Sequence, residues 1–326
     1  MGSEAHPRAL HALAAGHFTD LGKRFALGGR HVQMPGPGML RVSHPVPRLR
    51  LLLSVGVHGN ETAPIEMLAP VLAALADTPD LLAVDLLVVV GNAAAIAIGA
   101  RFVDADLNRL FTHARGALQD AAEAARADAV MQASADFFAL ADVPKWHLDL
   151  HSAIRPSRFP RFAIVPAAAG DAAQGPLIHW LGTAGIEAVV FNTQQAATYS
   201  AYTAHALGAL SCTVELGQIG LLGQHSPDQF VPTQRAIAAL LRGQDLLAGE
   251  VPVRFRVEQE IIKHTDAFRM CVDNGTHNFT AFAPGSIIAT DEKHLYRTGA
   301  ATEYILFPNP DVRIGQRAGL MVAQDR

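Results

Sequence analysis

The chain alternates between uninterrupted apolar runs and segments in which apolar residues recur at helical spacing. Runs that are apolar on both faces are typical of strands buried in a parallel sheet, and the helical segments supply the connections between them. We therefore predict an α/β fold with a mostly parallel sheet covered by helices on both faces. The predicted strands span residues 49–57, 82–90, 146–151, 161–165, 188–191 and 210–216, and the predicted helices span 64–76, 114–141 (one or two helices) and 232–248.

The pattern changes near residue 250. Beyond it, short alternating segments are separated by turn pairs such as Asn-Gly and Pro-Gly, which predicts a small β-rich domain over residues 251–326. The α/β unit then spans residues 49–250. Residues 1–48 contain four closely spaced prolines in their second half and are expected to form an irregular segment leading into that unit.

Composition narrows the class of protein. The 326 residues carry 26 Lys and Arg against 30 Asp and Glu, and this net charge of −4 argues against a nucleic-acid partner. The apolar run over residues 86–100 is too short to span a bilayer, and the first residues lack the basic start of a secretory signal. Two cysteines without C-x-x-C spacing exclude a disulfide scaffold. We expect a soluble, cytoplasmic enzyme with a small-molecule substrate and leave its oligomeric state open.

The strongest local motif, His58-Gly59-Asn60-Glu61, comes directly after a predicted strand and before a predicted helix. Ligands bind at the carboxyl ends of strands in open α/β sheets. An imidazole and a carboxylate in one tight turn can reach the same metal ion, although such pairs also occur by chance. A catalytic zinc site needs a third protein ligand and one open position.

A second motif, H-L-D-L-H over residues 147–151, supplies that third ligand. On a strand, His147, Asp149 and His151 share one face, and His151 lies at the carboxyl end. We predict that His151 joins His58 and Glu61 in binding one ion. Asp149 either orients a ligand imidazole or makes a structural hydrogen bond, and His147 is expected in the core.

Four more candidate site residues lie at or beyond the ends of two other predicted strands. Glu215, at the end of an apolar strand, would be costly to bury without a partner, and a metal-bound water is one whose proton it could accept. Arg101, Asn108 and Arg109 occur within nine positions beyond a strand end, where guanidinium and amide groups can bind a carboxylate.

With these residues assembled, the chain resembles the succinylglutamate desuccinylase/aspartoacylase family of carboxypeptidase A-type zinc hydrolases. The segments that carry the resemblance are G-V-H-G-N-E-T-A-P, D-A-D-L-N-R-L-F, W-H-L-D-L-H-S-A-I-R, C-T-V-E-L-G, E-Y-I-L-F-P-N-P and R-A-G-L-M. The resemblance covers nearly the whole chain apart from its N-terminal stretch. The fold implied is a carboxypeptidase-like α/β/α sandwich followed by a small β domain.

The resemblance also implies roles for the candidate residues. His58, Glu61 and His151 would hold one Zn²⁺, for which cobalt or manganese could substitute, and Glu215 would be the general base and acid. Arg101 would stabilise the oxyanion. Asn108 and Arg109 would bind a substrate carboxylate. The implied reaction is hydrolysis of N2-succinyl-L-glutamate to succinate and L-glutamate, the last step of the arginine succinyltransferase pathway.

Substrate specificity rests on fewer residues. Arg155, shortly after the third ligand, is our candidate for the far carboxylate of the succinyl group, whereas Arg158 and Arg161 are expected at the surface. In aspartoacylases an additional arginine precedes the catalytic glutamate, and residues 198–210 contain none, which disfavours N-acetylaspartate. A zinc deacylase for another N-acyl amino acid and a non-catalytic binding protein on the same fold remain the alternatives.

Overall fold

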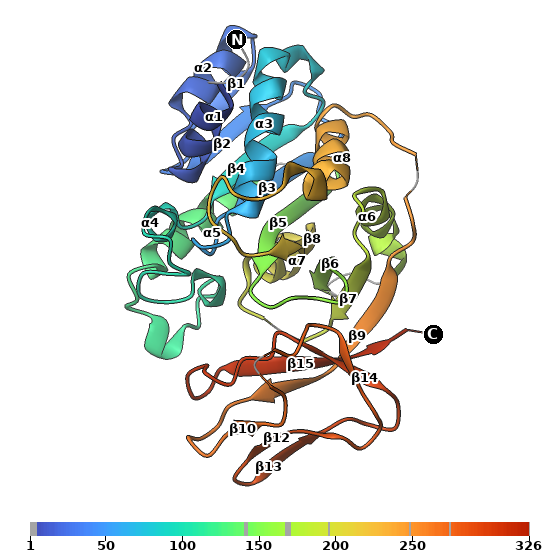
Figure 1. Cartoon of the computed structure of the whole chain (residues 1–326). Helices are drawn as coiled ribbons and strands as arrows, with labels where there is room; N and C mark the ends of the chain where they lie inside the picture. Colours follow the sequence, from blue (N-terminus) through green and yellow to red (C-terminus); the bar gives the residue numbers. More distant parts are fainter. Residues whose placement is uncertain are drawn as a thin grey trace.

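The computed structural model describes residues 5–139, 143–166, 171–194, 196–247, 249–273 and 275–325. Its centre is a mixed sheet that runs the length of the molecule (Figure 1). In spatial order its strands are β1 (His31–Gln33), β2 (Met39–Ser43), β4 (Asp85–Val90), β3 (Arg50–Val55), β5 (Lys145–Ala153), β8 (Leu210–Gln218), β6 (Arg161–Pro166), β7 (Ala188–Asn192), β9 (Val253–Ile262), β15 (Arg317–Gln324), β14 (Glu303–Leu306) and β11 (Thr280–Phe282). A second, smaller sheet contains β10 (Arg269–Met270), β12 (Ile287–Asp291) and β13 (His294–Arg297).

The predicted α/β class is confirmed, because the central strands β4, β3, β5 and β8 are mutually parallel and buried. The sheet is mixed: β2 and β6 run antiparallel to their neighbours β4 and β8. The helices are α1 (Ala5–Ala14), α2 (Thr19–Leu27), α3 (Ala63–Asp77), α4 (Ala93–Ala97), α5 (Ala124–Phe138), α6 (Asp171–Thr183), α7 (Tyr199–Leu207) and α8 (Val231–Leu241), with 3₁₀ turns at Pro79–Leu81, Leu107–Arg109, Gly116–Leu118 and Pro227–Phe230.

Helices cover both faces of the sheet, as the apolar runs predict. Along β3, Leu51 and Leu53 belong to a core shared with α1, α2, α3, α6 and α8, while Leu52 belongs to a core shared with α5 and α7. Each of these leucines is fully buried. Burial of one such side chain contributes about 1.5–3 kcal/mol, so this two-sided packing stabilises the central strands of the sheet. The candidate site residues lie at or beyond the carboxyl ends of those strands.

The expectation that residues 1–48 are irregular is wrong. They contain α1, α2, β1 and β2, and β2 extends the sheet by pairing antiparallel with β4. Phe18 and Phe25 are buried in the core that includes α3. The closely spaced prolines suggested an irregular segment, but they precede and follow β2 and do not interrupt it.

Two predicted helices have different bounds in the structure. The stretch 114–141 yields one α-helix, α5, and residues 140–142 lie outside the described residues. The helix expected over 232–248 ends with α8 at Leu241, because Gly243 adopts a positive φ of 62° that leaves the helical path.

The C-terminal segment joins the sheet through β9, which lies parallel to β7, and β15 and β14 then continue it. With the smaller sheet, these strands form the β-rich part at the bottom of Figure 1. In the described part of the chain, no helix has both the length and the apolar character needed to cross a membrane.

Candidate active site

The site lies where β3, β5 and β8 end. Because these strands are parallel, their carboxyl ends meet at one edge of the sheet. The register pairs His151 of β5 directly with Glu215 of β8, and the turn carrying His58 and Glu61 follows β3. The sequence therefore places a histidine or a carboxylate at the end of each of three neighbouring strands.

The turn after β3 requires glycine at its second position. A Cβ atom on Gly59 would lie 2.2 Å from the backbone carbon of Ala95 and 2.4 Å from the nitrogen of Ile96. The Gly59 amide donates a hydrogen bond to the carbonyl of Arg101 at 3.1 Å. This close approach joins the turn to the segment after β4 that carries Arg101.

His58, Glu61 and His151 form a group that can hold a metal ion, with one ligand atom from each within 4.8 Å of the others. Nδ1 of His58 lies 2.8 Å from Oε1 of Glu61, and Nδ1 of His151 lies 2.8 Å from Oε2. All three side chains are buried. Burial alone would raise the pKa of Glu61, but the two imidazoles hold that pKa well below its usual range. A buried carboxylate kept ionised between two imidazoles suits a divalent cation.

Nδ1 of His58 is buried and forms no hydrogen bond with a described residue; its close neighbour is Oε1 of Glu61, at 2.8 Å. The donor set fits zinc: two imidazoles and a carboxylate are the protein ligands of many catalytic zinc sites.

A carboxylate orients each ligand imidazole. His58 Nε2 lies 2.8 Å from Oδ1 of Asp106, and His151 Nε2 lies 3.0 Å from Oδ2 of Asp149. Asp149 also accepts a hydrogen bond from Ser54 at 2.5 Å. Of the two roles open to Asp149 in the sequence, the geometry thus supports orientation of a ligand. Sequence reasoning missed Asp106, although it lies in the quoted segment D-A-D-L-N-R-L-F.

His147 is a core residue, as expected. Its ring nitrogens hydrogen-bond to Ser54 at 2.7 Å and to Thr203 at 2.8 Å. Burial lowers the pKa of His147 to about 4, so the ring is neutral at physiological pH. Cys212 is also fully buried, and burial raises the pKa of its thiol, which fits a packing role.

Glu215 faces the cavity from β8. It is 7% exposed, and among the described residues its Oε2 atom has no hydrogen-bond partner. Burial, followed by the negative charge of Glu61, raises the pKa of Glu215 to about 7. A carboxylate with a pKa near neutrality can both accept and donate a proton at physiological pH.

Arg101 is held beside the metal-ligand group. Its Nη1 donates to Oε1 of Glu61 at 2.9 Å, and its Nη2 lies 3.7 Å from Oδ2 of Asp106. Asn108 is buried, and its Oδ1 accepts a hydrogen bond from the amide of Tyr199 at 2.8 Å. Arg109 donates from Nη1 to the carbonyl of Asn108 at 3.0 Å. Both Asn108 and Arg109 line the same cavity as Arg101.

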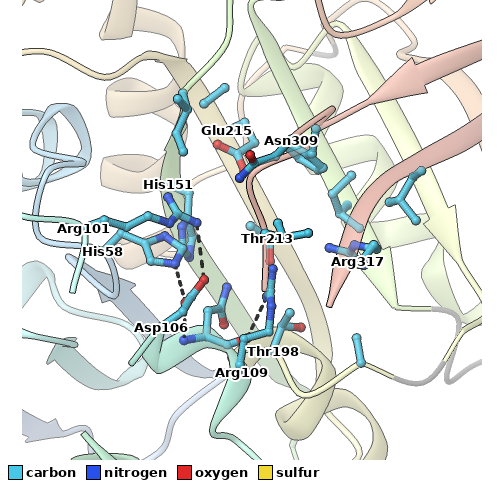
Figure 2. Close-up of a pocket in the computed structure, with 18 of the residues that line it drawn as sticks. His58, Arg101, Asp106, Arg109, His151, Thr198, Thr213, Glu215, Asn309 and Arg317 are labelled. Atoms are coloured by element: carbon cyan, nitrogen blue, oxygen red, sulfur yellow. Dashed lines mark hydrogen bonds and ion pairs between the residues drawn. The ribbon is translucent and has the colours of Figure 1, made fainter. Parts of the chain in front are cut away.

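The cavity has a volume of about 750 Å³ and is lined by both parts of the molecule (Figure 2). Arg155 lines it, as a substrate-binding role would require, whereas Arg158 and Arg161 do not. The C-terminal part contributes lining residues that sequence reasoning missed, among them Asn309 and Arg317. Asn309 lies in the F-P-N-P segment and Arg317 begins R-A-G-L-M, two segments that carry the family resemblance, but neither residue was assigned a role from the sequence.

Both parts of the chain match models of known protein families. Residues 47–243 match the family described as "Succinylglutamate desuccinylase/Aspartoacylase catalytic domain", and residues 250–325 match the "AstE/AspA barrel-sandwich hybrid domain". The chain is 43% identical to the succinylglutamate desuccinylase of Burkholderia lata over 84% of this chain and 79% of the relative. It is 40% identical to that of Burkholderia pseudomallei over 89% of this chain and 84% of the relative.

Solved structures agree with these sequence matches. The succinylglutamate desuccinylase of Chromobacterium violaceum superposes with a TM-score of 0.81 and 34% identity, covering 94% of this chain and 97% of that chain. The corresponding Vibrio parahaemolyticus structure gives a TM-score of 0.83 and 29% identity, covering 91% of this chain and 89% of that chain. Murine aminoacylase 3, at 20% identity, a TM-score of 0.56 and 87% and 97% coverage of the two chains, shows the same fold.

Proposed function

The chain belongs to the succinylglutamate desuccinylase/aspartoacylase family, and from this premise we propose that it is a zinc-dependent amidohydrolase for N2-succinyl-L-glutamate. The products are succinate and L-glutamate, and the reaction is the last step of the arginine succinyltransferase pathway. The names of its relatives indicate a desuccinylating hydrolase. The observation that carries the proposal is the convergence of His58, Glu61 and His151 beside Glu215 at one sheet edge.

The three ligands would hold one zinc ion, with Asp106 and Asp149 fixing the two imidazoles. When bound, zinc lowers the pKa of a coordinated water toward about 7 and polarises the amide carbonyl. Nδ1 of His58 supports this assignment, because this buried nitrogen forms no hydrogen bond with a described residue and can serve as a metal ligand without losing one.

Glu215 carries the proton. Its carboxylate accepts one proton from the attacking water, whose oxygen forms the new bond to the amide carbon. As the carbon–nitrogen bond breaks, Glu215 returns that proton to the departing glutamate nitrogen. The raised pKa of Glu215, about 7, suits both transfers.

Arg101 stabilises the charge that develops on the carbonyl oxygen. Its guanidinium is held by Glu61 at the edge of the metal-ligand group and remains 28% exposed toward the cavity. A fixed cation at this position lowers the energy of the tetrahedral intermediate without reorganising. Arg109, from the next turn of the same loop, binds a carboxylate of the substrate, with Asn108 beside it.

Arg155 is our candidate for the succinyl carboxylate, and its place in the cavity lining supports the assignment. If Arg155→Ala leaves the preference for succinyl over acetyl substrates unchanged, the assignment is wrong. The stretch 198–210 lacks the arginine expected of an aspartoacylase, which favours succinylglutamate over N-acetylaspartate.

The direct test compares substrates. Zinc-loaded protein is assayed with N2-succinyl-L-glutamate, N-acetyl-L-aspartate and N-acetyl-L-glutamate, and the metal-stripped protein is the blank. We expect rapid, zinc-dependent release of succinate from the first substrate. Faster hydrolysis of an acetyl substrate would favour the alternative deacylase, and no hydrolysis of any substrate would favour a binding protein.

A further inference from the structure

Positive charge gathers in the cavity although the protein is acidic overall. The net charge of the chain is −4, yet five arginines line this one cavity. Three of the four lining carboxylates, those of Glu61, Asp106 and Glu215, lie around the metal-ligand group. A cavity with this excess of positive charge attracts an anionic ligand. The five arginines are Arg101, Arg109, Arg155, Arg313 and Arg317.

Arg317 is the first residue of β15, in the C-terminal part of the chain. Figure 2 shows its side chain at the cavity on the side opposite His58 and Arg101. The guanidinium Nη1 donates to Oε1 of Glu260 at 3.3 Å. The Arg317 side chain is 20% exposed. Its Nε and Nη2 atoms form no hydrogen bond with any residue that the structure describes. Two donor nitrogens of the planar guanidinium, Nε and Nη2, thus remain for a ligand.

Arg109 and Arg317 repel each other electrostatically. Burial and the neighbouring charge of Arg109 lower the pKa of Arg317 to about 10, against the opposing effect of Glu260. The two arginines come from different elements, the loop after β4 and the start of β15. Two like charges held in one partly buried cavity repel each other, and an anion that binds between them removes that cost.

We propose that Arg317 is a specificity-determining residue that binds, together with Arg109, a substrate carboxylate remote from the scissile amide. The inference rests on the proposed function. Two such carboxylates exist in N2-succinyl-L-glutamate, at the end of the succinyl group and at the end of the glutamate side chain. The C-terminal β-rich part thereby completes the substrate pocket, since its strand β15 supplies the cation.

The test measures kcat/KM of wild type and Arg317→Ala on three substrates. N2-succinyl-L-glutamate carries both remote carboxylates, N-butyryl-L-glutamate replaces the succinyl carboxylate by a methyl group, and N-succinyl-L-norvaline does the same for the side-chain carboxylate. We expect Arg317→Ala to lower kcat/KM on the full substrate about 10- to 100-fold, mainly through KM. On one of the two truncated substrates wild type and variant should be equal, and that substrate identifies the carboxylate bound by Arg317.

An equal loss on all three substrates, or no loss on any, overturns the proposal. The matched control is Arg256→Ala, which removes an exposed arginine from the neighbouring strand β9, ion-paired with Asp325 and outside the cavity lining. It should leave all three values unchanged. If Arg317→Ala does not fold, as judged by its thermal unfolding, the same ratios are measured with Arg317→Gln.

A failure of the proposed function would be visible separately, because wild type would then release no succinate. In that case calorimetry of succinate and L-glutamate binding to the zinc-loaded protein tests Arg317 without turnover. Weaker binding of either dicarboxylate to Arg317→Ala than to wild type supports the proposal. Equal affinities for both dicarboxylates overturn it.

Discussion

Nε2 of His58 lies 2.8 Å from Oδ1 of Asp106, a contact that joins the turn after β3 to the loop after β4. Burial alone would raise the pKa of Asp106, but the charges of His58 and Arg109 hold it well below its usual range. The ionised carboxylate fixes the ring so that Nδ1 faces Glu61 and His151. An orienting carboxylate that lies outside the ligand set thus completes the candidate metal site.

Removing that carboxylate tests its role. Asp106→Asn should lower zinc affinity by about 10- to 100-fold, because the neutral amide holds the His58 ring in its orientation less firmly than the carboxylate does. Zinc affinity is measured by competition with a chromophoric chelator. The control is Asp104→Asn, an exposed carboxylate in the same loop that hydrogen-bonds to the amide of Ala122. Equal zinc affinities in wild type and Asp106→Asn would show that Asp106 does not orient a ligand.

Glu215 should be separable from metal binding. Glu215→Gln keeps the shape of the side chain and loses its base, so turnover should fall by about 10²- to 10⁴-fold. The zinc content, measured by elemental analysis after dialysis, should stay at that of wild type. Near-normal turnover of this variant would rule out proton transfer by Glu215.

The raised pKa of Glu215 predicts the acid limb of the pH profile. The proposed base is the ionised form, and the pKa of about 7 means that this form is depleted as the pH falls below 7. In wild type, kcat/KM should therefore decline toward tenfold per pH unit on the acid side. The residual activity of Glu215→Gln should lack this limb. The same limb in that variant would assign the titration to another group.

Much of the site is local in sequence, and for that reason it could be predicted. His58 and Glu61 share one turn, and His151 and Glu215 each end an apolar run, so the motifs and the strand ends sufficed. Asp106 was missed because its contact with His58 spans 48 residues and depends on how two loops meet.

The sequence could not predict which residues reach the cavity through pairing between strands that are far apart in the chain. Arg317 reaches the cavity because β15 pairs with β9 and β9 with β7, a register that no local pattern encodes. The structured N-terminal segment was missed for a related reason, since β2 becomes a strand by pairing with β4.

Glu123 provides a prediction about stability. Its buried carboxylate accepts hydrogen bonds from the amides of Val103, Asp104 and Ala105 and from the side chain of Asn92, at 2.7–3.3 Å. Glu123→Gln leaves some of these donors poorly paired and should lower the free energy of unfolding by about 1–3 kcal/mol at neutral pH. Urea denaturation measures the difference.

The pH dependence of that difference follows from the pKa. Burial would raise the pKa of Glu123, but the backbone amides hold it below its ordinary value. A lowered folded-state pKa contributes stability that is present above the unfolded-state pKa and is lost as the pH falls through the folded-state value. The gap between wild type and Glu123→Gln should therefore shrink in acid. A gap independent of pH would mean that the charge of Glu123 contributes nothing.

One zinc ion held by His58, Glu61 and His151 should be required for succinate release. Metal-free protein is titrated with zinc while succinate release from N2-succinyl-L-glutamate is measured at each addition. Activity should rise in proportion to zinc and stop rising at one equivalent per chain. Full activity before any zinc is added, or no activity at one bound equivalent, would contradict this requirement.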